Sequence, residues 1–100
     1  MTAYNVVRFR VKPGMEDAFI SSQRKSFEQP MAGAIDVALI KTGERSYCFI
    51  GKWDRFESIV AARPQMISFL DEVRPHLEDL GNGLGVTDPI SGTAVLEQTI

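Results

Sequence analysis

The pattern of apolar and polar positions predicts that strands and amphipathic helices alternate along the chain. Residues 4–11 are rich in β-forming side chains that alternate between two faces, and residues 15 to about 28 carry apolar side chains at helical spacing. Residues 34–41 and 47–53 alternate again like strands. The short, turn-prone link over residues 42–45 predicts that these two strands pair as an antiparallel hairpin.

A second helical segment follows Asp54, whose side chain is predicted to cap the first free amides of that helix. Pro64 interrupts the apolar stripe of this segment, and a proline inside a helix costs about 3 kcal/mol. We therefore predict two helical pieces that meet at Arg63 and Pro64, with Pro64 as the first residue of the second piece. Pro75 is expected to kink or shorten that second piece.

A loop rich in glycine and proline over residues 81–92 and a last strand over residues 93–100 complete the order β-α-β-β-α-β. This order predicts one α+β domain, residues 1–100, with a ferredoxin-like fold in which a four-stranded antiparallel sheet carries both helices on one face. The other face also carries apolar side chains that cannot all be left in water. We therefore expect a homodimer that packs through the helix-free face, with the residues Tyr4, Val6, Ala38, Ile40, Cys48, Ile50, Ala94 and Leu96.

Composition narrows the classes of function. The chain has 100 residues, 44% of them hydrophobic and 24% charged, with a net charge of -2, which is typical of a soluble globular domain. Its 11 basic residues are scattered and outnumbered by 13 acidic ones, so no nucleic-acid partner is expected. No apolar run is long enough for a membrane span, which predicts a cytoplasmic protein without a membrane partner. With one cysteine and one histidine, no internal disulfide, metal or cofactor is expected.

Several motifs together resemble a known family. The first strand runs into Lys-Pro-Gly at 12–14, a glycine precedes the second strand, and the third strand ends in Trp-Asp at 53–54 before an apolar helix. Across nearly the whole chain this pattern resembles the antibiotic biosynthesis monooxygenase family of the dimeric α+β barrel superfamily. The residues that carry the resemblance are Val11, Lys12, Pro13, Gly14, Gly33, Phe49, Trp53, Asp54, Phe69 and Leu70. The resemblance implies a dimeric α+β barrel built from two ferredoxin-like subunits.

The superfamily includes cofactor-independent oxygenases of polycyclic phenols or quinols, haem-degrading enzymes, and isomerases of sugar phosphates and lactones, so the fold alone does not select a reaction. The Asn, Trp and His of the haem-degrading members would fall on Val7, Ala62 and Glu72, and all three are therefore absent here. The phenol oxygenases resemble this chain at Trp53. The polar and the aromatic residue that accompany this tryptophan would fall on Phe49 and Ile59, and neither of these matches the pattern.

Three aromatic residues are the candidates for binding a small aromatic molecule. Trp53, Tyr47 and Phe49 share the helix side of the third strand, where a pocket between sheet and helices would form. Trp53 would stack against a flat aromatic substrate. The alternative is that Trp53 fills the core, where it would bury on the order of 200 Å².

His76 and Asn5 are the candidate catalytic residues. Histidine is the residue type whose ordinary pKa lies near neutrality, which suits a general base for a phenolic proton, but a cation near a helix end also complements the helix dipole. Asn5 is polar on an otherwise apolar strand face, where its amide would stabilise an anion or meet solvent at a frayed strand. On the opposite face Arg8, Arg10 and Lys52 would attract an anionic substrate or pair with acidic neighbours.

The residues and the resemblance together predict a cofactor-independent monooxygenase that acts on an electron-rich phenol or quinol. The deprotonated substrate would reduce oxygen itself, with His76 as the base, Asn5 as the polar anchor and Trp53 as the stacking wall. Two alternatives stay open. One is a non-catalytic dimeric module that binds a small molecule or has a filled core. The other is an isomerase of a small hydroxy-ketone or lactone, which needs a general acid and a general base in the pocket.

Overall fold

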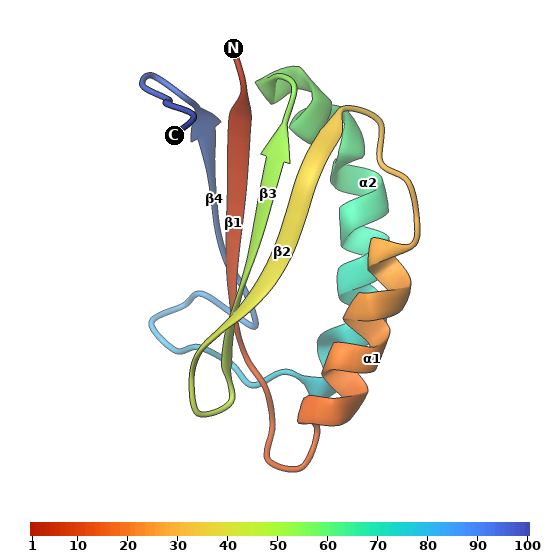
Figure 1. The fold of residues 1–100 in the computed structure, drawn as a ribbon. Helices are drawn as coiled ribbons and strands as arrows, with labels where there is room; N and C mark the ends of the chain where they lie inside the picture. Colours follow the sequence, from red (N-terminus) through yellow and green to blue (C-terminus); the bar gives the residue numbers. More distant parts are fainter.

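The structure, a computed structural model, describes residues 1–100 and has the order of strands and helices that the sequence predicts (Figure 1). Its elements are β1 (Ala3–Arg10), α1 (Glu16–Phe27), β2 (Ala34–Gly43), β3 (Ser46–Trp53), α2 (Phe56–Val73), the 3₁₀ turn η1 (Arg74–His76) and β4 (Asp88–Thr93).

The four strands form one antiparallel sheet in the order β2-β3-β1-β4, in which β2 and β3 pair as the predicted hairpin. Both helices pack on the same face of this sheet, and a long loop leads from the end of α2 to the edge strand β4 (Figure 1). This arrangement is the ferredoxin-like fold that the sequence predicts. None of the helices combines the length and the apolar character that a membrane crossing requires.

The register of the strands assigns side chains to the two faces of the sheet. Directly opposed residues of antiparallel strands share a face. Asn5 of β1 is opposed by Gly51 on β3 and by Ser91 on β4, and the Asn5 amide contacts Met66 of α2, so this row lies on the helix side. The adjacent row lies on the helix-free face and crosses all four strands with the apolar residues Ala38, Ile50, Val6 and Ile90.

The buried core is divided into two clusters. The larger cluster consists of Phe9, Val11, Phe19, Tyr47, Val73 and Leu77. The smaller cluster consists of Ala3, Trp53, Ile59 and Ala62. β1 supplies Ala3 to the smaller cluster and Phe9 to the larger one, and Val7 packs against the larger cluster, so Asn5 is the residue of this strand that lies between them. This division leaves room for a cavity at the centre of the helix side.

The last strand differs from the prediction. β4 includes Pro89 and Gly92, which the sequence predicts as loop, and residues 94–100 form no strand. Pro89 is tolerated because β4 is an edge strand that pairs only with β1, so no second neighbour requires the missing N–H. Ile90 therefore supplies the apolar side chain on the helix-free face that the sequence predicts for Ala94 and Leu96.

The second helix is continuous where the sequence predicts a break at Arg63 and Pro64. α2 contains Pro64 in its interior. Pro64 has no N–H to donate to the carbonyl of Val60, but both residues are exposed, so water can donate to that carbonyl instead. The turn η1 contains Pro75 and ends the helix, as the sequence predicts.

Asp54 does not cap α2 in the predicted way. The N-cap position is Arg55, without a side-chain cap, and Asp54 Oδ1 instead accepts a hydrogen bond from the Ser58 hydroxyl at 2.5 Å. Gly33 lies against this pair with a φ of +87°, and a Cβ atom at Gly33 would overlap both side chains. The Asp54 N–H also donates to the Gly33 carbonyl at 2.8 Å. These contacts join the start of α2 to the loop before β2.

Candidate functional site

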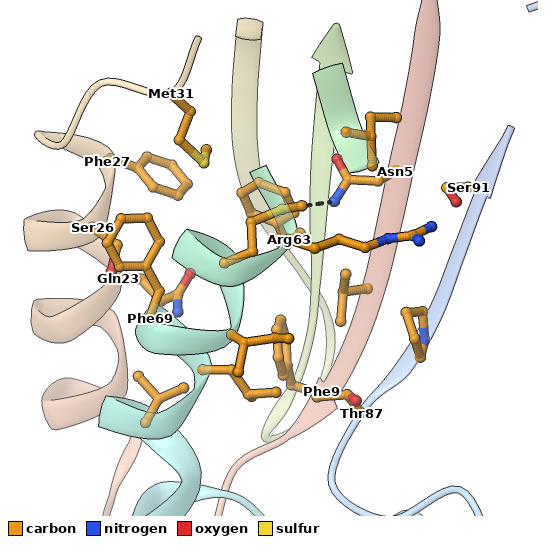
Figure 2. A pocket seen from close by; sticks show the side chains of 18 of the residues that line it. Asn5, Phe9, Gln23, Ser26, Phe27, Met31, Arg63, Phe69, Thr87 and Ser91 are labelled. Atoms are coloured by element: carbon orange, nitrogen blue, oxygen red, sulfur yellow. Dashed lines mark hydrogen bonds between the residues drawn. The ribbon is translucent and has the colours of Figure 1, made fainter. Parts of the chain in front are cut away.

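A cavity of about 480 Å³ opens between the two helices, the middle of β1 and the edge strand β4 (Figure 2). Its volume lies within the roughly 300–1,000 Å³ of typical small-molecule sites. Most of the wall is apolar and consists of Val7, Phe9, Phe27, Met31, Phe49, Ile59, Met66, Ile67, Phe69, Leu70, Val73 and Pro89. Ile90 of the edge strand β4 also borders the cavity, although the strand register assigns its side chain to the helix-free face. The polar residues of the wall are Asn5, Gln23, Ser26, Arg63, Thr87 and Ser91.

The Asn5 amide is the most buried polar group of this wall, and Trp53 fixes its orientation. Asn5 is 5% exposed, and its Oδ1 accepts a hydrogen bond from Trp53 Nε1 at 2.7 Å. The indole N–H is only a donor, so the oxygen of the amide must face it and the NH₂ group must face away from it. The predicted polar anchor therefore has one defined orientation.

The NH₂ group of Asn5 lacks a strong acceptor within the protein. Its partner is the Met66 sulfur, at 3.6 Å from Asn5 Nδ2 (Figure 2). A thioether is a weak acceptor, and an NH₂ group has two protons to donate. Asn5 can therefore donate a hydrogen bond to an oxygen atom of a molecule in the cavity.

Gly51 provides the space in which Asn5 and Trp53 meet. It lies directly opposite Asn5 on β3 and two residues before Trp53, on the same face. A Cβ atom at Gly51 would lie 2.3 Å from Asn5 Oδ1 and 2.8 Å from Trp53 Nε1. Any larger residue here would therefore displace the hydrogen bond that orients the amide.

Phe49 is the one predicted aromatic residue that lines the cavity. Its ring meets the ring of Phe27 from α1 nearly edge to face, with the centroids 6.0 Å apart and an interplanar angle of 71°. Trp53 is fully buried in the smaller core cluster and does not line the cavity, so it fills the core and acts on the site through Asn5. The aromatic side chains that line the cavity are Phe9, Phe27, Phe49 and Phe69.

Tyr47 lies outside the cavity, in the larger core cluster beside Phe19. Its hydroxyl donates a hydrogen bond to the Glu16 carboxylate, which also accepts one from Lys41 at 2.9 Å. Burial, and then the hydrogen bond to Glu16, raise the pKa of Tyr47 above its ordinary value. Tyr47 therefore stays a neutral phenol and joins α1 to the sheet.

His76 does not lie in the cavity wall. It ends the turn η1, where its carbonyl accepts a hydrogen bond from the Lys12 N–H at 2.8 Å. Its Nδ1 is buried without a hydrogen-bond partner. Of the predicted catalytic pair, the structure therefore places Asn5 at the cavity and His76 elsewhere.

Two polar residues of the wall, Gln23 and Arg63, were not among the predicted site residues. Gln23 lies on α1 and is 8% exposed. Arg63 lies on α2 in the stripe of side chains that faces the cavity, which also contains Ile59, Met66, Leu70 and Val73. An arginine at a position where the helical period calls for an apolar residue is a signal in the sequence. The predicted break at Pro64 hides this signal, because the break separates Arg63 from the second half of the apolar stripe.

The cations of the helix-free face are mostly paired. Arg8 pairs with Asp88 at 2.5 Å, and Lys52 lies 3.9 Å from Glu97. Arg10 lies beside a smaller hollow of about 170 Å³. This pattern agrees with the predicted ion pairs more than with an anion-binding surface, since exposed pairs of this kind leave little net charge to attract a ligand.

The cavity wall offers hydrogen bonds and one positive charge but no acid–base pair. No Asp, Glu, His, Lys, Cys or Tyr lines it. An isomerase needs both a general acid and a general base next to its substrate. The isomerase alternative therefore has no support in this cavity. Nowhere in the structure do three or more His, Cys, Asp or Glu side chains lie close enough together to hold a metal ion.

No protein-family model matches the sequence, and no curated protein matches it either. Solved structures do match the fold. SnoaB, a cofactor-independent oxygenase from Streptomyces nogalater, is 18% identical with a TM-score of 0.74, over 96% of this chain and 95% of that chain. A protein named as an antibiotic biosynthesis monooxygenase, from Chloroflexus aurantiacus, is 18% identical with a TM-score of 0.70, over 100% of this chain and 99% of that chain.

A conserved protein from Methanosarcina mazei is similar in the same way, with 14% identity and a TM-score of 0.78 over 93% of this chain and 92% of that chain. These similarities extend over whole chains, so they concern the complete fold and not one motif. The chain therefore has the ferredoxin-like fold of the antibiotic biosynthesis monooxygenases, as the resemblance of its motifs predicts.

Proposed function

We propose that this protein is a cofactor-independent monooxygenase that acts on an electron-rich phenol or quinol bound in the cavity. The observation that carries the proposal is the buried Asn5 amide, which Trp53 orients and whose NH₂ group faces an apolar cavity with only a thioether as its partner. The fold shared with SnoaB, a cofactor-independent oxygenase, supports the same reaction class.

The reaction needs no external reductant. A phenol or quinol with hydrogen on a ring carbon ortho or para to a hydroxyl loses the phenolic proton and transfers electrons to O₂. A carbon–oxygen bond forms at that carbon, the O–O bond then breaks, and the outer oxygen leaves as water with the two protons that the substrate has lost. In sum, one phenol and one O₂ give one quinone and one water, and the substrate is the only species oxidised.

Asn5 would assist this reaction by donating a hydrogen bond to the substrate oxygen that carries the negative charge. A donor fixed in a water-poor site stabilises such a charge more than a mobile donor does, because it does not have to reorient. The apolar wall, with the rings of Phe27 and Phe49, would hold the flat substrate.

Oxygen uptake tests the proposal directly. Added phenols and hydroquinones are expected to cause uptake of one O₂ per substrate without release of hydrogen peroxide, and this activity is expected to survive chelation and dialysis. The comparison is with the same substrates without protein, because electron-rich phenols also oxidise slowly in solution. Binding of these phenols without any oxygen uptake would overturn the proposal in favour of the non-catalytic binding module.

Replacement of His76 by alanine is expected to change kcat/KM less than about threefold, because His76 does not line the cavity. The substrate then binds as a phenolate formed in solution. The pH at which the rate is half-maximal should therefore follow the pKa of each substrate phenol and move down when electron-withdrawing groups lower it. A folded His76→Ala protein with a loss of 100-fold or more at every pH would restore His76 as the base.

We also propose that the helix-free face packs against a second copy of the chain. The row of Ala38, Ile50, Val6 and Ile90 forms an apolar band across all four strands, and Ile90 is 67% exposed. Bands of this kind on a sheet face are rarely left in water. A second copy would cover the band on both molecules at once.

Ile40→Asp is expected to convert the dimer into a monomer in sedimentation velocity, because it would bury an unpaired charge in the interface. Val60→Asp is the matched control, since Ile40 and Val60 are both 44% exposed but Val60 lies on α2, away from this face. The control should remain a dimer. A wild-type protein that sediments as a monomer at all concentrations would contradict the proposal.

A further inference from the structure

We infer that Arg63 selects substrates that carry a carboxylate, so that the substrate class is a hydroxyaromatic acid with its phenolic oxygen at Asn5 and its carboxylate at Arg63. The inference rests on the proposed function for the phenolic end of the molecule. To that function it adds the residue Arg63, a positive charge that binds the substrate carboxylate, and one orientation of the substrate in the cavity. The oxygenation itself requires none of these.

Arg63 is a cation without a counter-ion. The five ion pairs of the structure use the cations Arg8, Lys41, Arg45, Lys52 and Arg74. Arg63 takes part in none of them and in no side-chain hydrogen bond, although it is the only charged residue in the cavity wall. A free guanidinium beside an apolar cavity is a site for an anion.

The position of Arg63 on α2 directs it to the cavity. It lies four residues after Ile59 and three before Met66, and all three line the cavity. Figure 2 shows the Arg63 side chain extending from α2 across the opening toward β1 and β4, on the side where Asn5 and Ser91 lie. The charge is therefore available to a molecule in the cavity.

The polar groups of the wall differ in depth. Asn5 and Gln23 are 5% and 8% exposed, whereas the Arg63 side chain is exposed to solvent. A carboxylate deep in an apolar cavity would lose its hydration, but at Arg63 it keeps contact with water while it gains an opposite charge. The wall therefore suits a ligand with an apolar ring system inside, a hydroxyl at its buried end and a charged group at the mouth.

A carboxylate fits Arg63 better than a second phenolate does. The guanidinium presents parallel N–H groups in a plane, which match the two oxygens of a carboxylate, whereas a phenolate offers one oxygen. Gln23 is nearly buried and makes no side-chain hydrogen bond within the protein, so it offers a further donor and acceptor to substituents along the ring system.

Calorimetric titration with a matched pair of probes, 6-hydroxy-2-naphthoate and 2-naphthol, tests the inference without requiring turnover. The acid is expected to bind about 10- to 100-fold more tightly than the naphthol, as is typical of a hydrogen-bonded charge pair. Arg63→Gln should abolish this preference and Arg63→Lys should reduce it, while 2-naphthol binds all three proteins within about twofold. Arg55→Gln is the control, because it removes an equally unpaired cation outside the cavity wall.

The ionic strength of the buffer provides a test that needs no variant. Raising the salt from 0.05 to 0.5 M should weaken binding of the naphthoate several-fold and leave 2-naphthol unchanged, since salt screens an exposed charge pair. Equal affinities of both probes for wild type and Arg63→Gln would overturn the inference and leave the proposed function standing. If neither probe binds, both the inference about Arg63 and the proposed function fail.

Discussion

Replacement of Asn5 by alanine is expected to lower kcat for phenol oxidation about 100- to 1,000-fold, which is the usual effect of removing one fixed donor from a site of developing negative charge. The substitution would also leave the buried Trp53 N–H without its acceptor, which costs about 1–3 kcal/mol of stability. Initial rates of oxygen uptake at saturating substrate measure the first effect, and urea denaturation measures the second.

Two further variants distinguish the effect of losing the Asn5 N–H donor from the effect of losing the Trp53 hydrogen bond that orients it. Asn5→Asp keeps an acceptor for Trp53 but has no N–H to donate, so it should lose activity as severely as Asn5→Ala does. Trp53→Phe removes the indole donor that orients the amide, and it should lower kcat less than either, since the amide donor remains. An Asn5→Ala protein that keeps kcat within threefold of wild type would show that Asn5 does not act in the reaction.

Gly51→Ala is expected to reduce the free energy of unfolding by about 1–3 kcal/mol, because the new methyl group would overlap Asn5 and Trp53 in a packed region. In a domain of this size each kcal/mol lowers the melting temperature by about 4–8 °C. The displaced hydrogen bond should also shift the fluorescence of Trp53, the only tryptophan, and lower oxygenase activity. Thermal denaturation followed by that fluorescence records both changes in one experiment.

Gly92→Ala is the matched control for this variant. It changes a glycine of the same sheet, but a Cβ atom at Gly92 would meet nothing within 4 Å. Its stability should therefore stay within about 0.5 kcal/mol of wild type. If Gly51→Ala and Gly92→Ala melt at the same temperature and retain equal activity, the steric role assigned to Gly51 is wrong.

The architecture was predictable because it follows from local pattern. Alternation over residues 4–11 and 47–53 identifies strands and their faces, and helical spacing identifies α1, whose bounds differ from the prediction by one residue at each end. Of the three errors in the fold, the last strand and the break in α2 involve proline, and the third is the cap predicted for Asp54. Pro89 lies in an edge strand, where its missing N–H costs no hydrogen bond to a second strand. Pro64 leaves the carbonyl of Val60 without a donor in the helix, but Val60 is exposed and water can donate to it. The position of a proline in the tertiary structure therefore decides whether it ends a helix or strand.

The site was less predictable than the fold. Asn5 and Phe49 were accessible to prediction because the period of a strand determines their face. Trp53 and His76 both lie outside the cavity wall. The spacing of apolar residues along the chain cannot predict this, since it depends on how α2 crosses the sheet. Arg63 can be recognised as a residue of the cavity wall only in a continuous α2, because a continuous helix puts Arg63 on the same face as the apolar residues on both sides of Pro64.

The division of the core into two clusters has a consequence for the search for a ligand. In a domain of 100 residues an apolar cavity of about 480 Å³ removes packing that the fold would otherwise have at its centre. A ligand that fills it would contact both clusters and complete the core, and at 100 times its dissociation constant it would add about 2.7 kcal/mol to the stability. A rise in melting temperature would therefore identify molecules that bind this cavity without any assumption about the reaction that follows.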